Sequence, residues 1–427
     1  GMSDLTDLLT CLCLYAVEAE KIRLRFEQSE LLEALVSQSK AEGAEASEFM
    51  MGLGFSADEA NGLVRIWPQQ TLARVLELVR HREMFHLDIR KQTNNWNSRR
   101  TDLWTAQIGQ AMRDTIGFDP SELPADRRVH IISSNTHSVS NCLNPWFAQN
   151  RADVLSWAKE RQHHALQEEW HNESDLAYAM MRDYFKCFPE KAREAALEGR
   201  GFGIYTLQET ASTGIQVQII DCAALAGAAI DPDVIPVPAG NTDIIINIDY
   251  AFGQQAEHIM RNLVMLFGSN VASINFFGKA GTLYGARGDI LVPTAFIEQT
   301  SDLFQPLPQP ASRVIADLEN RLPGRQVHVG PMLTVEGTLM QNRMMLHFYR
   351  RIWNCAGLEM EGTYYYRQVL EATQIGVIPR DVEMRFFYYV SDLPMSPDFG
   401  LASPMALSEG VPPLYAITRH ILSGIFS

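Results

Sequence analysis

The chain has few cysteines and no C-x-x-C motif. Six cysteines are scattered over 427 residues, so neither a zinc site nor a disulfide framework is indicated. No apolar stretch reaches the length needed to span a membrane, and no secretory leader is evident in the first residues. We therefore expect a cytoplasmic protein without a membrane partner.

Positive charge is also scarce. The 36 Lys and Arg residues are outnumbered by 51 Asp and Glu residues, which gives a net charge of -15. A surplus of negative charge repels nucleic-acid backbones and anionic lipids. We expect no nucleic-acid partner, whereas a small phosphorylated ligand needs only a few local cations.

The first part of the chain has a helical pattern. From Leu5 to about Arg113 apolar residues recur at helical spacing, which indicates several helices packed as a bundle. Ser56 followed by Glu59 fits a capping box that starts one of them. With 427 residues the chain is long enough for two domains, and we expect the helical N-terminal region to cover residues 1–125.

Strand patterns begin at residue 129. Short β-rich runs alternate with helical segments, which is typical of an α/β domain with a largely parallel central sheet. The runs are Val129–Ile132, Ile204–Leu207, Ile215–Ile220, Ile244–Ile248, Ile274–Phe277, Ile290–Pro293, Val327–Val329 and Phe386–Val390. We expect this domain to cover residues 126–427, with a helical insertion at about 150–200 and a surface loop at 305–310.

A glycine-rich segment follows the fifth of these runs. Gly278 and Gly281 come directly after an apolar strand pattern, which favours a turn whose backbone an anion or a sugar can approach closely. Two acidic segments come later in the chain, Glu359–Gly362 at the head of a helix and Ser391–Asp392 at the end of a strand. Each has a simpler explanation, because acids are common in first helical turns and as helix caps.

Taken together, the three segments resemble the nucleoside phosphorylase and nucleosidase superfamily. The similarity lies in Gly278–Gly281 with the following Gly288–Asp289, in Glu359–Gly362 and in Val390–Pro394, and the last of these is most similar to the AMP nucleosidases. It covers roughly the last two hundred residues, about the size of one domain. The resemblance implies a phosphorylase-like fold with a central, mostly parallel sheet flanked by helices, to which the N-terminal helical region is added.

The resemblance also implies an activity, which is cleavage of the N-glycosidic bond of a purine nucleoside or nucleotide by hydrolysis or phosphorolysis. This chemistry needs a protonated leaving base, a held sugar and a nucleophile. By analogy Asp392 is the general acid beside the base, with Ser391 next to it. Glu361 accepts hydrogen bonds from the ribose hydroxyls, with Met360 against the sugar and Glu359 as a supporting neighbour.

The glycine segment departs from the family pattern. Gly278, Lys279, Ala280 and Gly281 match the loop near the nucleophile and the sugar, but Lys279 stands where the family usually has Ser, Thr or His, and Thr282 replaces a second glycine. A lysine there could neutralise a phosphate group or fill the nucleophile pocket and abolish activity. Two hypotheses therefore stand, an enzyme and a catalytically inactive nucleoside-binding or regulatory relative.

Three weaker signals complete the set. Phe252 or Tyr250 could stack on a base, although aromatics in such turns are more often part of the core. The polar stretch 133–141 fits a phosphate-contacting loop or ordinary turn chemistry equally well.

The third weak signal is a group of potential metal ligands. His164, Glu168 and His171 have helical spacing, which a solvated helix face explains better than a metal site. We expect no metal and no cofactor, with phosphate as a candidate co-substrate. The resemblance further implies a homo-oligomer whose size the sequence does not give.

Overall fold

The computed structural model describes residues 2–81, 94–208, 210–211, 213–253, 255–301, 303–337, 343–396 and 405–427, without the side chains of 2–7 and 94–98. The chain forms two compact units, one of Leu5–Lys91 and one of Gln92–Ser427 together with Gly1–Asp4. Among the described helices none is both long and apolar enough to cross a membrane.

The unit Leu5–Lys91 is helical. Its helices are α1 (Met2–Arg25), α2 (Ser29–Ser37), α3 (Gly43–Gly52), α4 (Ala57–Ile66) and α5 (Thr71–Arg80). Their apolar faces meet in a core that contains Phe26, Leu35, Met50, Ala60 and Leu72. Helix α4 begins at the predicted capping box, which is confirmed: the Glu59 amide donates to Ser56 Oγ at 3.2 Å, and the Ser56 amide donates to Glu59 Oε2 at 2.8 Å.

The unit Gln92–Ser427 is built around one ten-stranded sheet. Its strands are β1 (Val129–Ser133), β2 (Ile204–Thr206), β3 (Val217–Asp221), β4 (Ile244–Ile248), β5 (Val271–Thr282), β6 (Ile290–Glu298), β7 (Leu303–Pro306), β8 (Val327–Thr334), β9 (Gly357–Glu359) and β10 (Glu383–Asp392). Each predicted strand has a counterpart here. The sequence analysis missed β9 and placed a surface loop where the end of β7 lies.

The sheet is mixed, so the expectation of a mostly parallel sheet is wrong. Five of its ten strand pairings are parallel and five are antiparallel. Strands β5, β9, β8, β6 and β10 pair in succession, and β10 pairs back to β5, so these five close into a barrel. Closure requires the strand direction to reverse between β5 and β9 and between β6 and β10. The alternation of strands and helices in the sequence does not reveal these reversals.

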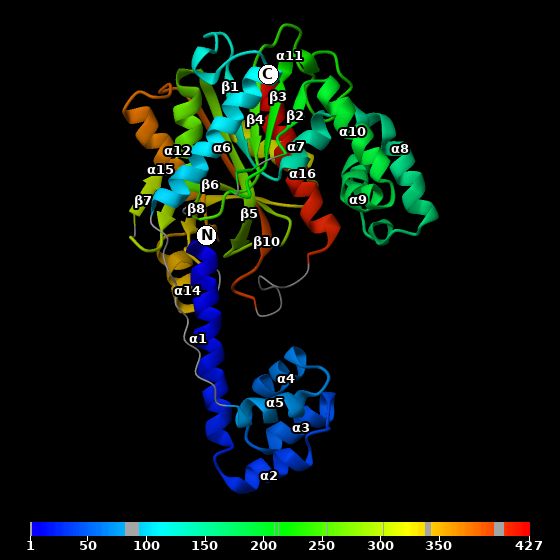
Figure 1. The fold of residues 1–427 in the computed structure, drawn as a ribbon, viewed down its shortest axis with the longest axis vertical. Helices are drawn as coiled ribbons and strands as arrows, with labels where there is room; N and C mark the ends of the chain where they lie inside the picture. Colours follow the sequence, from blue (N-terminus) through cyan, green and yellow to red (C-terminus); the bar gives the residue numbers. More distant parts are fainter. Residues whose placement is uncertain are drawn as a thin grey trace. The chain divides into compact units, whose positions relative to one another are not determined.

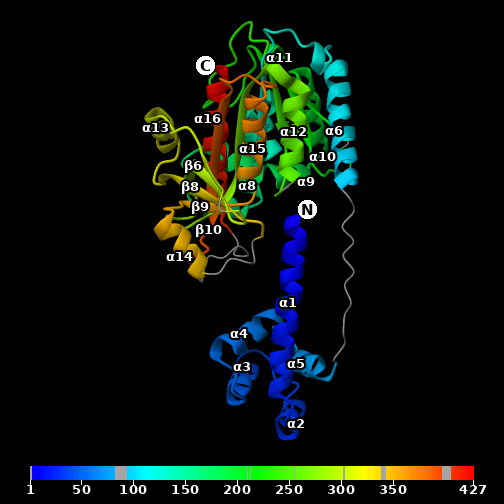
Figure 2. The same ribbon diagram turned by 90° about the vertical axis from the view of Figure 1, so that its left-hand side faces the viewer.

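Helices cover both faces of the sheet (Figures 1 and 2). One layer holds α6 (Asn94–Thr115), α12 (Gln255–Phe267) and α15 (Gly362–Gln374), which pack side by side. The other holds α7 (Thr136–Leu143), α13 (Ser312–Arg321) and α16 (Leu407–Phe426). Smaller helices are α11 (Cys222–Leu225), α14 (Arg343–Ile352) and the 3-10 turns Pro120–Glu122, His164–Gln167 and Gly268–Asn270.

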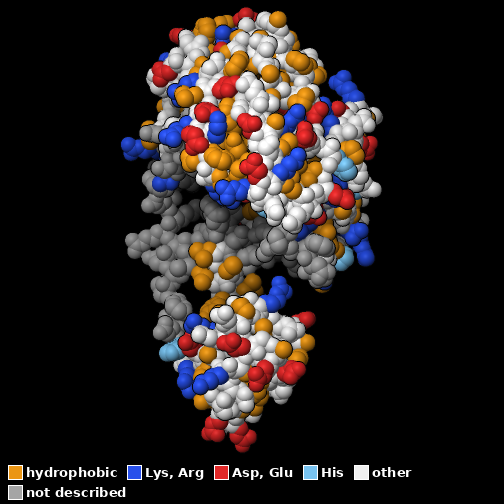
Figure 3. Space-filling view, turned by 90° about the vertical axis from the view of Figure 1, so that its right-hand side faces the viewer, with side chains coloured by type: hydrophobic (Ala, Val, Ile, Leu, Met, Phe, Trp, Pro, Cys, Tyr) orange, Lys and Arg blue, Asp and Glu red, His pale blue; other side chains and the backbone are white. Residues whose placement is uncertain are grey.

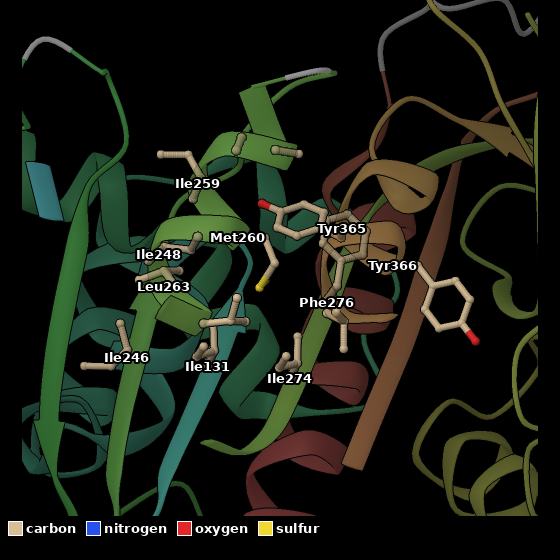
Figure 4. Packing of buried hydrophobic residues seen from close by; sticks show 14 of the residues in the cluster. Ile131, Ile246, Ile248, Ile259, Met260, Leu263, Ile274, Phe276, Tyr365 and Tyr366 are labelled. Carbon is tan, nitrogen blue, oxygen red and sulfur yellow. The ribbon is translucent and has the colours of Figure 1, made fainter. Parts of the chain in front are cut away.

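The main core lies between the first helical layer and the sheet (Figure 4). Ile131, Ile246 and Ile274 of three neighbouring parallel strands meet Met260 and Leu263 of α12, and all five are fully or almost fully buried. Successive side chains of a strand alternate between the two faces, so the β-branched runs found in the sequence supply both this core and the one under α16. The packing fixes the strand ends that carry the candidate site.

A helical insertion with its own core separates β1 and α7 from β2. It consists of α8 (Pro145–Glu160), α9 (Glu173–Cys187) and α10 (Pro189–Gly201). It is joined to α16 by a buried ion-pair network: Arg419 pairs with Asp175 of α9 at 2.7 Å and, through two nitrogens, with Asp231 at 3.0 and 3.1 Å.

Candidate active site

The carboxyl ends of four parallel-related strands meet at one edge of the sheet. Strand β1 runs parallel to β4 and β5, and β5 runs parallel to β10. Ligands of α/β proteins bind beyond such ends. Asp392 is the last residue of β10, and Glu361, between β9 and α15, accepts a hydrogen bond from the amide of Gly253 in the turn after β4.

The segment Gly278–Gly281 is strand, and the predicted glycine-rich turn is therefore wrong. These residues belong to β5 and pair with β10, Gly278 with Tyr388 and Gly281 with Asp392. Neither glycine has a positive φ. Their role is close approach, because a Cβ on Gly281 would lie 2.7 Å from Asp392 Oδ2 and 2.8 Å from Pro394 Cγ. Gly281 therefore makes the room that the Asp392 carboxylate occupies.

Replacing Gly281 tests this close approach. We expect Gly281→Ala to lower the free energy of unfolding by about 1–3 kcal/mol and to displace the Asp392 carboxylate, because the added methyl overpacks the strand ends. Urea unfolding measures the first effect. Gly62→Ala in α4 is the control, since its Cβ meets nothing within 4 Å, and we expect it to be neutral or slightly stabilising. Equal unfolding midpoints for Gly281→Ala and the wild type would contradict the assignment.

Asp392 is a buried carboxyl group, 6% exposed. Burial raises its pKa above the ordinary value, while the Ser391 hydrogen bond and the charges of Arg287 and Lys279 oppose the rise. Ser391 Oγ donates to Asp392 Oδ1 at 2.7 Å, so Ser391 orients the carboxyl group. The capping alternative does not hold, because the next described helix, α16, has its N-cap at Ala406.

Glu359 and Glu361 have different roles although they are two residues apart. Glu359 is 3% exposed, and its carboxylate accepts from the amides of Glu361 at 2.7 Å and Gly362 at 2.5 Å and from the hydroxyl of Thr334. It therefore anchors the N-terminus of α15, as the helix-dipole interpretation predicts. Burial raises the pKa of Glu359 as well, and the three donors oppose the rise.

The carboxylate of Glu361 lies against the turn that follows β4. It is half-buried, and backbone amides of Met360 and Gly253 donate to its carboxylate. Burial, and next the adjacent charge of Glu359, raise the pKa of Glu361 to about 8. Three donors stabilise the ionised form of Glu359, so the proton of this pair resides on Glu361 near neutral pH.

This raised pKa makes stability depend on pH. An unfolded glutamate with a pKa near 4.5 loses its proton earlier than folded Glu361, so the free energy of unfolding falls as pH rises between the two values. We expect Glu361→Gln to gain ~2–4 kcal/mol relative to the wild type on going from the lower to the upper end of this window. Urea unfolding at both ends measures it, with exposed Glu30→Gln as the control. A difference that does not change with pH would contradict the raised pKa.

The turn after β4 lies against Glu361. The charge of Glu361 and the backbone of Asn135 both act on the pKa of Tyr250, which burial raises well above its ordinary value. Phe252 is 56% exposed and its ring centroid lies 6.4 Å from that of Tyr250. An exposed aromatic is accessible for stacking on a ligand, whereas a core aromatic is not.

The polar stretch 133–141 is largely used inside the protein. Ser133 Oγ and Tyr365 OH are 2.8 Å apart, and Ser134 Oγ donates to Asn247 Oδ1 at 3.0 Å. From Thr136 onward the stretch is helix α7. These contacts favour structural roles over phosphate binding for the two serines.

The remaining predicted residues are placed as follows. Met360 is half-buried and packs against the cluster that includes Leu333 and Leu358. Lys279 is exposed on β5, and its positive charge lowers the pKa of Asp392. Ala280 is buried in the main core. Neither Asp392 nor Glu361 is among the groups that shift the pKa of the other.

Sequence reasoning missed the residues that hold these acids in place. Arg287 acts on Asp392, Thr334 on Glu359 and Gly253 on Glu361. Each contact joins segments far apart in the chain, so no local pattern could have revealed it.

No metal centre is found in the described part of the chain, where no group of three His, Cys, Asp or Glu residues could hold an ion. The predicted helical spacing of His164, Glu168 and His171 does not produce a shared face. His164–Gln167 is a short 3-10 turn capped by Glu168, and α9 starts only at Glu173.

One family pattern matches the chain over its whole length, residues 1–427, and it is described as the family of unknown function DUF6909. The chain belongs to the DUF6909 family. Among curated proteins none matches it.

Several solved structures share a weak likeness with this family member. A Helicobacter pylori MTAN mutant with 5′-methylthioadenosine in its active site has 12% identity and a TM-score of 0.39, over 70% of this chain and 98% of that one. A futalosine hydrolase mutant from Helicobacter pylori has 12% identity and a TM-score of 0.38, with 69% and 98% covered. A purine nucleoside phosphorylase from Toxoplasma gondii in complex with immucillin-H has 13% identity and a TM-score of 0.38, with 72% and 94% covered. TM-scores this low support no inference about the function of this chain.

Proposed function

We propose that this chain cleaves the N-glycosidic bond of a purine nucleoside or nucleotide. The observation that carries the proposal is a buried acid with a raised pKa, Asp392, at the carboxyl edge of one sheet, together with a half-buried acid, Glu361, which follows β9, a strand that pairs with β5 at Gly281 as Asp392 does. Such an edge is the usual ligand site of α/β proteins. The order of the three segments resembles the nucleosidase superfamily, and similarity to the AMP nucleosidases in particular is a prediction.

The proposed roles follow from the two environments. Asp392 donates its proton to a ring nitrogen of the base, which makes the base a better leaving group, and burial favours the protonated form that this step needs. Glu361 binds the ribose hydroxyls, and in its ionised form it stabilises positive charge on the sugar as the C–N bond breaks. Water or phosphate then adds to the anomeric carbon and gives free base with ribose or with ribose 1-phosphate.

A panel of purine nucleosides and nucleotides tests this proposal. Each is incubated with the full chain in the presence and in the absence of phosphate, and free base is measured by chromatography. We expect release of base from at least one member, and the phosphate requirement identifies the nucleophile. No release from any member would refute the proposal.

A second candidate function is ligand binding without catalysis, and Lys279 is the observation that favours it. This exposed cation lies on β5, close enough to lower the pKa of Asp392, where the related enzymes usually have a hydroxyl or an imidazole. Thermal-shift screening distinguishes the two functions, because a binder is stabilised by a ligand that stays unchanged. For a binder, Lys279→Ser would give turnover that the wild type lacks.

A further inference from the structure

The first half of α1 is apolar on every side. The ten residues from Leu8 to Val17 contain no charge, and Asp7 and Glu18 bound them. Ten residues make nearly three helical turns, so the run covers the whole circumference. A helix that is hydrophobic all round is normally buried.

The described helices of this unit leave the run exposed. Among the described residues, α1 contributes Ala19 and Ile22 of its second half to the core, and the first half extends past α2–α5 (Figure 2). Six large apolar side chains of the run are between 39% and 53% exposed: Leu8, Leu9, Leu12, Leu14, Tyr15 and Val17. Contiguous exposure of this kind indicates an interaction surface.

A groove lies alongside this surface within the same unit. It has a volume of about 1300 Å³ and is lined by α1 residues, among them Leu9, Leu12 and Ala16, and by Leu78 of α5 and Trp67. The charged residues that line it pair with one another: Arg23 with Glu20 at 3.4 Å and Arg74 with Glu77 at 2.8 Å. The groove therefore has a neutral rim and suits an uncharged apolar helix.

We propose that two copies of this chain pair through α1, each placing its Leu8–Val17 run in the α1/α5 groove of the other. The same helix supplies both the projecting side chains and a wall of the groove, which is the self-complementarity that a two-fold contact requires. Although the chain carries a net charge of -15, the surface that meets is uncharged. Six side chains exposed by about half give roughly 500 Å² per copy and ~1,000 Å² per pair, the size of a specific interface. This inference is independent of the proposed enzymatic function.

Light scattering of the full chain tests the proposal first. We expect an assembly with an even number of copies, and Leu12→Glu to lower its association constant about a hundredfold, because a carboxylate would be buried in the apolar contact. Ile66→Glu is the matched control, since Ile66 is an exposed helical residue of the same unit, 65% exposed, outside the groove. Circular dichroism verifies that both variants are folded.

Chemical cross-linking through cysteine provides a second test of the contact between the two copies. Cys13 lines the groove, while Cys187 is an exposed cysteine on α9. In a chain with Cys11→Ser and Cys187→Ser, a short bismaleimide should join two copies through Cys13. A chain that keeps Cys187 in place of Cys13 should stay uncross-linked. A monomeric wild type, or an assembly that forms no Cys13 cross-link and tolerates Leu12→Glu, would overturn the proposal.

Discussion

Asp392→Asn is expected to lower kcat for base release by about 10²–10⁴-fold, the usual contribution of a general acid. The amide keeps the shape of the carboxyl group and can still accept the Ser391 hydrogen bond of 2.7 Å, but it has no acidic proton to give to the base. Chromatographic measurement of free purine under saturating substrate gives the effect directly. The loss should appear in kcat with little change in KM, because the interaction is made in the transition state.

Asp381→Asn is the matched control for this experiment. Asp381 is an exposed carboxylate just before β10, and we expect its replacement to leave turnover unchanged. Equal unfolding midpoints for the two variants would exclude a loss of fold as the cause. If Asp392→Asn retains wild-type turnover, Asp392 is not the acid and the proposed mechanism fails.

Arg419→Met is expected to have the largest effect on stability, about 3–5 kcal/mol, because it leaves buried carboxylates without their cation. Arg419 is 3% exposed and pairs with Asp231 and Asp175, which are 2% and 4% exposed. Burial raises the pKa of Asp175 to about 7 even with the arginine present. Urea unfolding of the full chain measures the loss, which should be greatest where both acids are ionised.

Arg74→Met provides the comparison, since Arg74 is 48% exposed and pairs with Glu77 on the surface of α5. Its loss should cost less than about 1 kcal/mol. The triple variant Arg419→Met, Asp231→Asn, Asp175→Asn should recover most of the stability. A small cost for Arg419→Met alone would show that the acids become protonated or hydrated and that the network does not hold α9 to α16.

The sequence predicted the strands better than it predicted the sheet. Runs of β-branched residues such as Ile244–Ile248 form strands because their side chains fill both faces of a buried sheet. Strand β9 has three residues, too few for any periodicity, and β7 ends at Pro306, a residue type that argues against a strand except at an edge. The direction of each strand depends on long-range pairing, which no local pattern encodes.

The candidate site was likewise predictable only in part. The residue types at Asp392 and Glu361 were recognisable from short motifs, and in the structure Asp392 and the strand before Glu361 both pair with Gly281 of β5. The separate roles of Glu359 and Glu361 were not, because they depend on Thr334 and Gly253, which are distant in sequence. Gly278 and Gly281 favour a turn in the sequence because glycine allows positive φ and close backbone approach, whereas in the strand it is the Asp392 side chain that requires the missing Cβ of Gly281.

The fit between Gly281 and Asp392 has an evolutionary consequence. A Cβ at position 281 would lie 2.7 Å from Asp392 Oδ2 and 2.8 Å from Pro394 Cγ, so a larger residue at position 281 requires changes at both neighbours. Selection for function should preserve the combination of glycine and aspartate as one unit. Because Pro394 Cγ would also lie 2.8 Å from that Cβ, shortening the acid alone, as in Asp392→Ala, does not free position 281, and related chains that have lost the acid should still keep glycine there.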